Sequence, residues 1–276
     1  MSFMLQLLGP VEAIQDGHRL SLGPPKRRAM LTALALDANR VVSLDRLTQS
    51  IWTAPPASAV ANLRSHAGEL RHALSGRIAA KDGGYVLAVR PGELDMEDFL
   101  RLAASGRRAL AAGDAAHASV QLGEALRHWR GQAADGLDVG PSLDVRLRSL
   151  DELRLDAFED YLQARQAVSA YPDTVAELWT HVQEHPLRER AWGLLMLALY
   201  RTGNTAAALD SFAQARAVLA EQLGVGPGPE LAALHRAILD RDASLDASPP
   251  GGQIVRQARA WRFRSNVGPA YGYPAA

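Results

Sequence analysis

Two adjoining stretches decide the fold: ASAVANLRSHAGELRHALS at residues 57–75 and RIAAKDGGYVLAV at residues 77–89. In the first, apolar residues recur three or four positions apart, which predicts the buried face of a helix; they are Val60, Leu63, Ala67, Leu70 and Leu74. In the second, two apolar runs flank Asp82-Gly83-Gly84, a composition that favours a tight turn between paired strands. Together they predict a helix followed directly by a β-hairpin with Lys81 at its tip.

Upstream of this pair the pattern changes from strands to helices. Before residue 25, short apolar runs alternate with turn signals such as Asp16-Gly17, which predicts short strands. Two helices are then expected, over residues 26–37 and over residues 44–52 with Ser43 as N-cap. Strands, three helices and a hairpin are the order of a winged helix-turn-helix, whose third helix reads DNA. A small α+β core without a DNA role is the alternative for the same pattern.

Residues 93–245 are predicted to be almost entirely helical, with breaks at glycine and proline. The expected helices span residues 95–112, 115–128, 147–169, 174–184, 187–202, 205–223 and 230–243. Trp192 begins the better of two degenerate tetratricopeptide-type repeats and is expected to lie in the core. The stretch from Gly224 to Pro229 is interpreted as a C-cap and a stiff linker. Stacked helical pairs provide surface for partners and no inherent chemistry.

The expected fold class is therefore mainly α, with small β-sheets in an N-terminal winged helix-turn-helix and a tetratricopeptide-like all-α domain after it. We predict the winged helix over residues 1–92, the helical domain over residues 93–245 and a disordered tail over residues 246–276. The tail interleaves arginines with aromatic residues and has no composition for a packed core.

The net charge of zero hides an asymmetry along the 276 residues. Residues 1–90 hold 11 basic and 6 acidic residues, a balance of +5, whereas residues 91–245 hold 15 basic and 23 acidic residues, a balance of −8. A basic first third favours a polyanion such as nucleic acid as partner. With no cysteine, disulfides and thiolate metal sites are excluded. No signal peptide or run of eighteen apolar residues is found, so we expect a cytoplasmic protein without a membrane partner.

One motif suggests metal chemistry. Residues 181–185, HVQEH, match the H-x-x-E-H pattern of a zinc peptidase, in which two histidines hold the metal. Pro186 follows directly and places His185 at a fraying helix end, where a cationic histidine also suits the helix dipole. The phosphate-binding and nucleophile motifs G-x-x-x-x-G-K-[ST] and G-x-S-x-G do not occur. We therefore expect no enzyme, no cofactor and no metal, with a zinc hydrolase as the alternative.

The candidate DNA contacts lie on and around the predicted third helix. Its outward face is expected to carry Ser65, Glu69 and His72, with Asn62 nearby and Arg64 and Arg71 on the flank. Asparagine, serine, histidine and arginine bind base edges or phosphates. Arg27, Arg28 and Lys81 are expected to clamp the DNA backbone on either side. Glu69 repels phosphate; it either accepts a bond from a cytosine amino group or weakens binding.

Two stretches resemble the bacterial transcriptional activation domain: His185–Gly203, and Leu219–Leu231 followed by Leu234–Leu239. The first 92 residues are similar to the OmpR-type winged helix of the antibiotic regulatory proteins, the SARP family, through Asn62-Leu63-Arg64 and Leu70–Leu74. The family usually has a basic residue where Glu69 stands, and this departure bears on DNA affinity.

The resemblance implies a stand-alone transcriptional activator in the bacterial cytoplasm, associated with the nucleoid. Such proteins bind direct repeats in promoter DNA, often as dimers, contact RNA polymerase and control secondary-metabolite (antibiotic) gene clusters. A protein-interaction adaptor with a winged helix that no longer binds DNA is the alternative, favoured by Glu69 and by the modest charge of the first domain.

Overall fold

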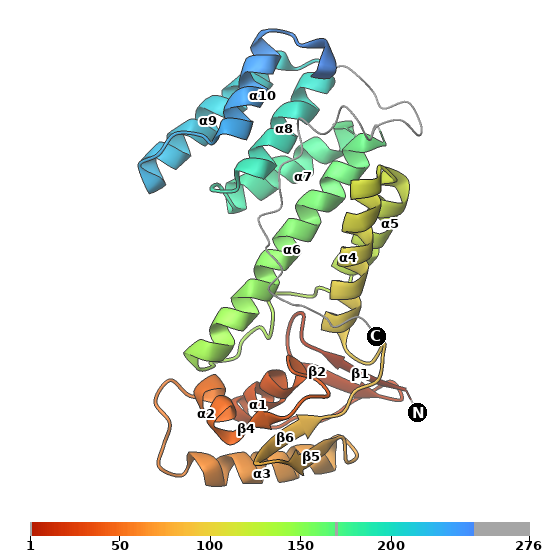
Figure 1. Cartoon of the computed structure of the whole chain (residues 1–276), viewed down its shortest axis with the longest axis vertical. Helices are drawn as coiled ribbons and strands as arrows, with labels where there is room; N and C mark the ends of the chain where they lie inside the picture. Colours follow the sequence, from red (N-terminus) through yellow and green to blue (C-terminus); the bar gives the residue numbers. More distant parts are fainter. Residues whose placement is uncertain (1, 169–170, 246–276) are drawn as a thin grey trace. The chain divides into compact units, whose positions relative to one another are not determined.

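The computed structural model describes residues 2–168 and 171–245 (Figure 1). The chain divides into two compact units: the first is Met1–Ala104 with Gly123–Ala157, and the second is Ser105–Leu122 with Phe158–Ala276. The tail over residues 246–276, for which disorder is predicted, lies outside the described residues. The domain boundary at residue 92 stays a prediction, since the compact units follow a different division.

The first unit begins with a small antiparallel sheet in the order β1-β2-β3. Its strands are β1 (Phe3–Gln6), β2 (Glu12–Gln15) and β3 (His18–Arg19). The turn between β2 and β3 is Asp16-Gly17, with φ of 49° and 83°, as its sequence predicts. Leu5 and Ala13 point from paired positions of β1 and β2 into the core.

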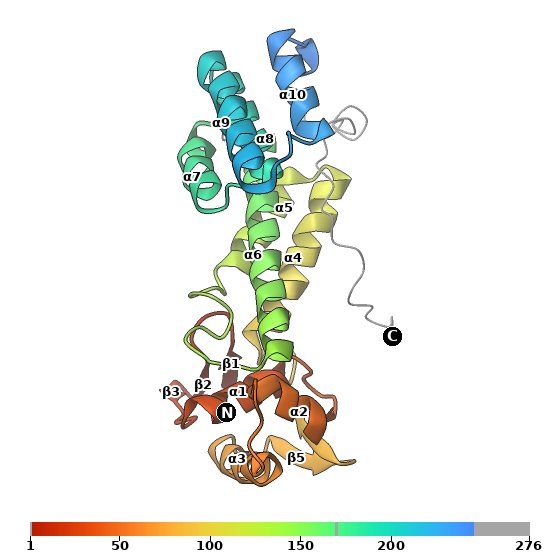
Figure 2. The ribbon, with the colours of Figure 1, turned by 90° about the vertical axis from the view of Figure 1, so that its left-hand side faces the viewer.

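Three helices and a second sheet complete the winged helix. The helices are α1 (Pro25–Ala35), α2 (Leu44–Ile51) and α3 (Ala59–Ala73), and the sheet has the order β4-β6-β5, with β4 (Val42–Ser43), β5 (Ile78–Lys81) and β6 (Gly84–Leu87). In both views α3 lies beside β5, on the side of α1 and α2 away from the first sheet (Figures 1 and 2). The predicted strands, three helices and hairpin are confirmed.

Single residues fix these elements where the sequence predicts. The Ser43 hydroxyl accepts the Arg46 amide at 3.3 Å and caps α2. Asp82 and Gly83, with φ of 47° and 75°, close the hairpin. Gly84 is required beside β4, because a Cβ there would stand 2.2 Å from the Val42 carbonyl oxygen.

The buried carboxylate of Asp95, the first residue of α4 (Asp95–Ala112), holds the end of the first sheet. It accepts the amides of Leu7 at 2.8 Å and of Leu8 at 3.0 Å. Burial raises the pKa of Asp95 although these hydrogen bonds oppose it. Nearby, Phe99 and Trp129 meet edge to face, with centroids 5.2 Å apart. The first unit thus joins the winged helix to residues well beyond position 92.

The largest difference from the prediction is α6 (Pro141–Ala167), which starts six residues before the expected position 147. Gly140-Pro141 suggests a break, but proline suits the first turn of a helix, where its missing N–H is not needed. The extra turns belong to the first unit: the Gly140 amide donates to the Ser50 carbonyl at 2.8 Å, and Arg146 binds Asp37 at 2.7 Å. Helix α5 (Ala115–Leu126) ends two residues earlier than predicted.

The second unit consists of packed helices, with Trp192 at its centre. Its helices include α7 (Tyr171–Glu184), α8 (Glu189–Arg201), α9 (Thr205–Leu223) and α10 (Pro229–Leu239) (Figure 2). Trp192 is 1% exposed, donates from its indole nitrogen to the Pro186 carbonyl at 2.9 Å and meets Trp179 edge to face. The core position predicted for Trp192 is confirmed, and Gly224 ends α9 with φ of 70°, as predicted. None of the helices in the described ranges has the length and apolar character needed to cross a membrane.

Candidate nucleic-acid interface

Helix α3 has a buried face and an exposed face, as its periodicity predicts. Ala59, Leu63, Ala67 and Leu70 are buried. The prediction is wrong for Val60, which is 40% exposed, because Ala59 takes the buried position in the first turn. The opposite side is exposed and carries the predicted polar set, Arg64, Ser65, Glu69, Arg71 and His72.

Two of the predicted contacts are tied to the protein at the ends of α3. Asn62 is half-buried, and its amide donates to the Ser58 hydroxyl at 3.3 Å. The Arg71 Nε donates to the Ile78 carbonyl at 2.8 Å and so links α3 to the start of β5. This bond uses one of the five N–H groups of the guanidinium, and Arg71 remains exposed.

Arg27 and Glu69, both predicted as contacts, lie together. The Arg27 Nη1 stands 3.7 Å from the Glu69 Oε2, and the side chains are 21% and 60% exposed. His66, one turn earlier on α3, is half-buried; burial and the charge of Arg27 lower the pKa of its imidazole. An arginine of α1 is therefore brought against the helix expected to read DNA.

Arg28 and Lys81 lie in other surroundings. Arg28 is half-buried and lines an open hollow of about 300 Å³ with Glu12 of β2 and residues of the connection from β3 to α1. Lys81 is exposed and pairs with Gly84 at the end of the hairpin. The structure thus gathers Arg27 with the α3 residues, sets Lys81 on the hairpin next to α3 in the fold, and sets Arg28 with the first sheet.

Sequence reasoning missed the structural role of Lys26. Its ammonium donates to the Ile51 carbonyl at 3.1 Å and to the Asp138 carboxylate at 2.9 Å, and so fastens the start of α1. Asp37 in turn binds Arg46 at 3.0 Å and Arg146 at 2.7 Å. These partners lie up to 112 residues apart, and no local pattern signals them.

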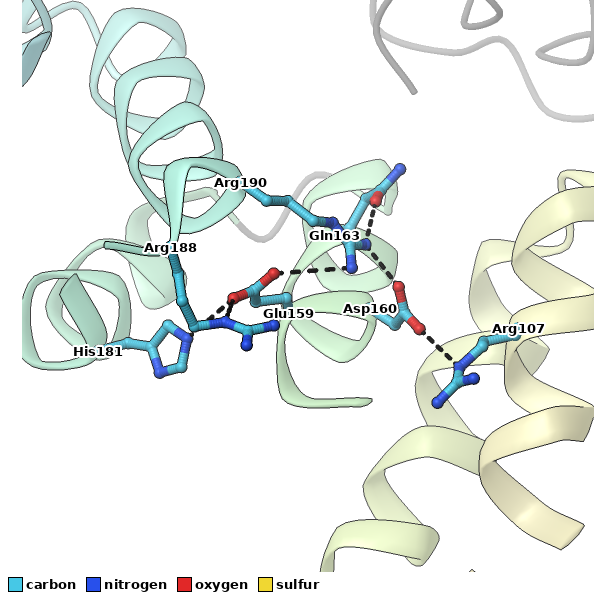
Figure 3. Close-up of polar contacts among 7 residues, drawn as sticks. All are labelled: Arg107, Glu159, Asp160, Gln163, His181, Arg188 and Arg190. Carbon is cyan, nitrogen blue, oxygen red and sulfur yellow. Dashed lines mark hydrogen bonds and ion pairs between the residues drawn. The ribbon is translucent and has the colours of Figure 1, made fainter. Parts of the chain in front are cut away.

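His181, the first histidine of the H-x-x-E-H motif, belongs to a buried ion network in the second unit (Figure 3). His181 Nε2 lies 3.2 Å from the Glu159 carboxylate, which also binds Arg188. Burial opposes ionisation, but hydrogen bonds from His181 and Arg188 outweigh it and lower the pKa of Glu159. Within residues 2–168 and 171–245, no group of three histidine or carboxylate side chains is arranged to hold a metal ion.

The same network continues through Asp160. Arg190 donates to Asp160 at 2.5 Å and to Gln163 at 2.7 Å, and Arg107 binds the other Asp160 oxygen at 3.1 Å. Glu159 and Asp160 are 1% and 4% exposed. Their partners come from α4, α7 and the start of α8, so the network joins four helices.

Comparison with known proteins identifies the helical part of the chain. The model of the bacterial transcriptional activator domain matches residues 94–239. The chain is 39% identical to the regulatory protein AfsR of Streptomyces griseus over 241 residues, covering 87% of this chain and 25% of AfsR. It is 32% identical to the regulatory protein DnrI of Streptomyces peucetius, covering 89% of this chain and 95% of DnrI.

A solved structure extends the similarity to the fold. EmbR of Mycobacterium tuberculosis, in a complex with a low-affinity phosphopeptide, aligns with a TM-score of 0.84 and 31% identity. The alignment covers 94% of this chain and 68% of that chain. The chain spans only about a quarter of AfsR but nearly all of DnrI. With a matched activator domain and these relatives, the chain belongs to the SARP family of transcriptional regulators.

Proposed function

We propose that this regulator is a sequence-specific DNA-binding activator of a secondary-metabolite (antibiotic) gene cluster. Helix α3 enters the major groove, and the hairpin with Lys81 contacts the adjoining backbone. Two copies bind direct repeats in a promoter and recruit RNA polymerase. The protein acts in the cytoplasm, associated with the nucleoid.

The exposed face of α3 is the single observation that carries this proposal. Arg64, Ser65, Arg71 and His72 are exposed on a helix whose other face is anchored in the core. Arginine forms paired hydrogen bonds with guanine, and serine or histidine complements other base edges. The names of AfsR and DnrI as regulatory proteins support a role in transcription, and the family name motivates the antibiotic target.

Mapping of bound DNA across the genome of the native host tests the proposal. We expect discrete sites upstream of a biosynthetic gene cluster, with a repeated sequence element. A mobility assay with that element then compares the wild type with Arg64→Ala. The absence of discrete sites, or equal binding by the variant, would contradict the assignment of α3.

The pairing of Arg27 with Glu69 favours a second candidate, a protein-interaction adaptor that has lost DNA binding. An arginine balanced by a carboxylate contributes less to phosphate binding than a free one. The candidates differ in salt dependence: a DNA-binding protein loses affinity for a duplex steeply as salt rises, because phosphate contacts release counterions. An adaptor shows no duplex binding at low salt.

A further inference from the structure

Arg27 is enclosed on the side that adjoins α3. Only 21% of its side chain is exposed. Gly23, with φ of 76°, brings the backbone so close that a Cβ there would stand 2.6 Å from the Arg27 Nη1. The Arg27 Nε is buried without a hydrogen-bond partner within residues 2–168 and 171–245. The guanidinium is therefore held between the turn before α1 and the side of α3.

On the α3 side, Glu69 supplies the opposite charge. Its carboxylate lies 3.7 Å from the Arg27 Nη1 and is itself 60% exposed. His66, the other α3 neighbour, has a lowered pKa through burial and through Arg27, so its imidazole is neutral near pH 7. Arg27 thus has a solvent-facing counterion that belongs to the helix predicted to read DNA.

A pair of this kind is readily exchanged. At 3.7 Å the two groups are beyond good hydrogen-bond distance, and water screens a carboxylate that is mostly exposed. A DNA phosphate is an equivalent oxygen anion and competes for the same guanidinium. Each phosphate contact contributes to binding on any sequence, whereas base contacts contribute only on the correct one.

We propose that Glu69 masks Arg27, so that a DNA phosphate binds Arg27 only by displacing the Glu69 carboxylate. The inference rests on the proposed DNA binding and assigns Glu69 a role within it. Masking weakens binding to every duplex by one contact. Because a phosphate contact contributes to binding on any sequence, the mask lowers the affinity for the mapped element and for unrelated DNA by the same factor and leaves the preference between them unchanged.

A double-mutant cycle on the full chain tests the mask. Affinity for a duplex carrying the mapped element and for a scrambled duplex is measured across a salt series for wild type, Glu69→Gln, Arg27→Gln and both together. We expect Glu69→Gln to bind both duplexes about two- to fivefold more tightly, with a salt slope steeper by about 0.9, the value for one added phosphate contact. We expect this gain in affinity to disappear when Glu69→Gln is combined with Arg27→Gln. It should persist when Glu69→Gln is combined with Arg27→Lys, which keeps the positive charge.

A matched control removes a different acid. Asp82→Asn takes one negative charge from the hairpin tip and keeps the left-handed turn, because asparagine tolerates positive φ. Any gain from Asp82→Asn persists without Arg27. If the gain in duplex affinity from Glu69→Gln also persists without Arg27, the mask is overturned and Glu69 simply repels phosphate. If Glu69→Gln brings no gain in affinity, the mask is overturned and Glu69 has no role in DNA binding.

A measurement without DNA separates this inference from the proposed function. NMR titration of His66 in the intact protein reports whether Arg27 lies against α3. We expect Arg27→Gln to raise the pKa of His66, and an unchanged pKa overturns the geometry, whatever the DNA result. A wild-type chain that binds neither duplex overturns the proposed function, and the mask with it. Thermal unfolding of each variant verifies that it is folded.

Discussion

On α3 the charged side chains are exposed, whereas in the second unit Glu159, Asp160 and their partners share a buried network. Exposed ion pairs contribute about 0–1 kcal/mol to stability, because water and salt screen them. A buried carboxylate that loses its partners, or buried arginines that lose a carboxylate, cost roughly 3–5 kcal/mol. Charge can therefore change on α3 at little structural cost, while a change of charge within the buried network of the second unit is costly.

The arginines of the two regions therefore differ in what they can bind. Arginines on α3 remain accessible to an outside partner, as a reading surface requires. Arg107 and Arg190 are taken up by Asp160 and hold helices together.

The largest expected effect is on the core of the second unit. Trp192→Ala removes a ring that is 1% exposed, and such truncations cost about 3–5 kcal/mol. We expect lower thermal stability and lost promoter activation together. Calorimetry and a reporter gene measure the two. If Trp192→Ala melted like the wild type but no longer activated the promoter, Trp192 would instead contact a partner. The contrast between an exposed α3 and a structural second unit would then be wrong.

Glu159→Gln is expected to have the next largest effect, a loss of about 3 kcal/mol in the free energy of unfolding. Glu159 is only 1% exposed, and the substitution removes the charge that binds Arg188. The matched control is Glu177→Gln, whose carboxylate is 38% exposed and binds Arg165; we expect a loss of about 0–1 kcal/mol there. Urea unfolding of both variants gives the difference. Equal losses would remove the distinction between buried and exposed pairs.

The pH dependence of folding stability should also depend on Glu159. The pKa of Glu159 in the folded protein is lower than its ordinary value of 4.5. A carboxyl with a lowered pKa stabilises the fold above its unfolded pKa, and that contribution is lost as the pH falls through the folded pKa. We expect the wild type to lose stability below about pH 4.5, and Glu159→Gln to lose less over that window. Unfolding free energies measured from pH 7 to pH 3 provide the comparison.

The sequence predicts the features that depend on residues a few positions apart, and it does not predict the ion pairs between residues far apart in the chain. The α3 stripe, the Asp82-Gly83 turn and the position of Trp192 follow from residues within a few positions of one another. Glu159 and Asp160 look like ordinary polar residues of a long helix, because their partners lie 22 to 53 residues away. The H-x-x-E-H pattern suggests that His181 is a zinc ligand, whereas in the structure the His181 imidazole contacts the Glu159 carboxylate.

The candidate site divides in the same way. Exposure of Arg64, Ser65 and His72 follows from helical periodicity. Arg27 and Arg28 are adjacent in the sequence, which predicts that both contact the DNA backbone on the same side. In the structure Arg27 lies by Glu69, and Arg28 lies by Glu12 and the first sheet. Successive residues of a helix are 100° apart, so neighbours face different surroundings, and only the tertiary structure shows which.

Arg64→Ala tests the exposed side of the contrast. We expect the affinity for the mapped element to fall by about 1–3 kcal/mol, as for a lost base contact, while stability stays within about 0.5 kcal/mol of wild type. The control is Arg101→Ala, which removes an exposed arginine from α4 and should leave DNA affinity unchanged. A mobility assay and thermal unfolding measure the two effects. Loss of stability in Arg64→Ala would show that α3 is not a free reading surface.

The smallest expected effect is that of Lys81→Gln, and its pattern matters more than its size. Lys81 is exposed at the hairpin tip, where we expect it to contact phosphate and no base. We therefore expect a modest loss, about equal on the mapped element and on a scrambled duplex, with a salt slope shallower by about 0.9. Arg64→Ala should instead reduce the preference for the mapped element. If Lys81→Gln also reduced that preference, the hairpin would take part in base recognition, and the reading surface would extend beyond α3.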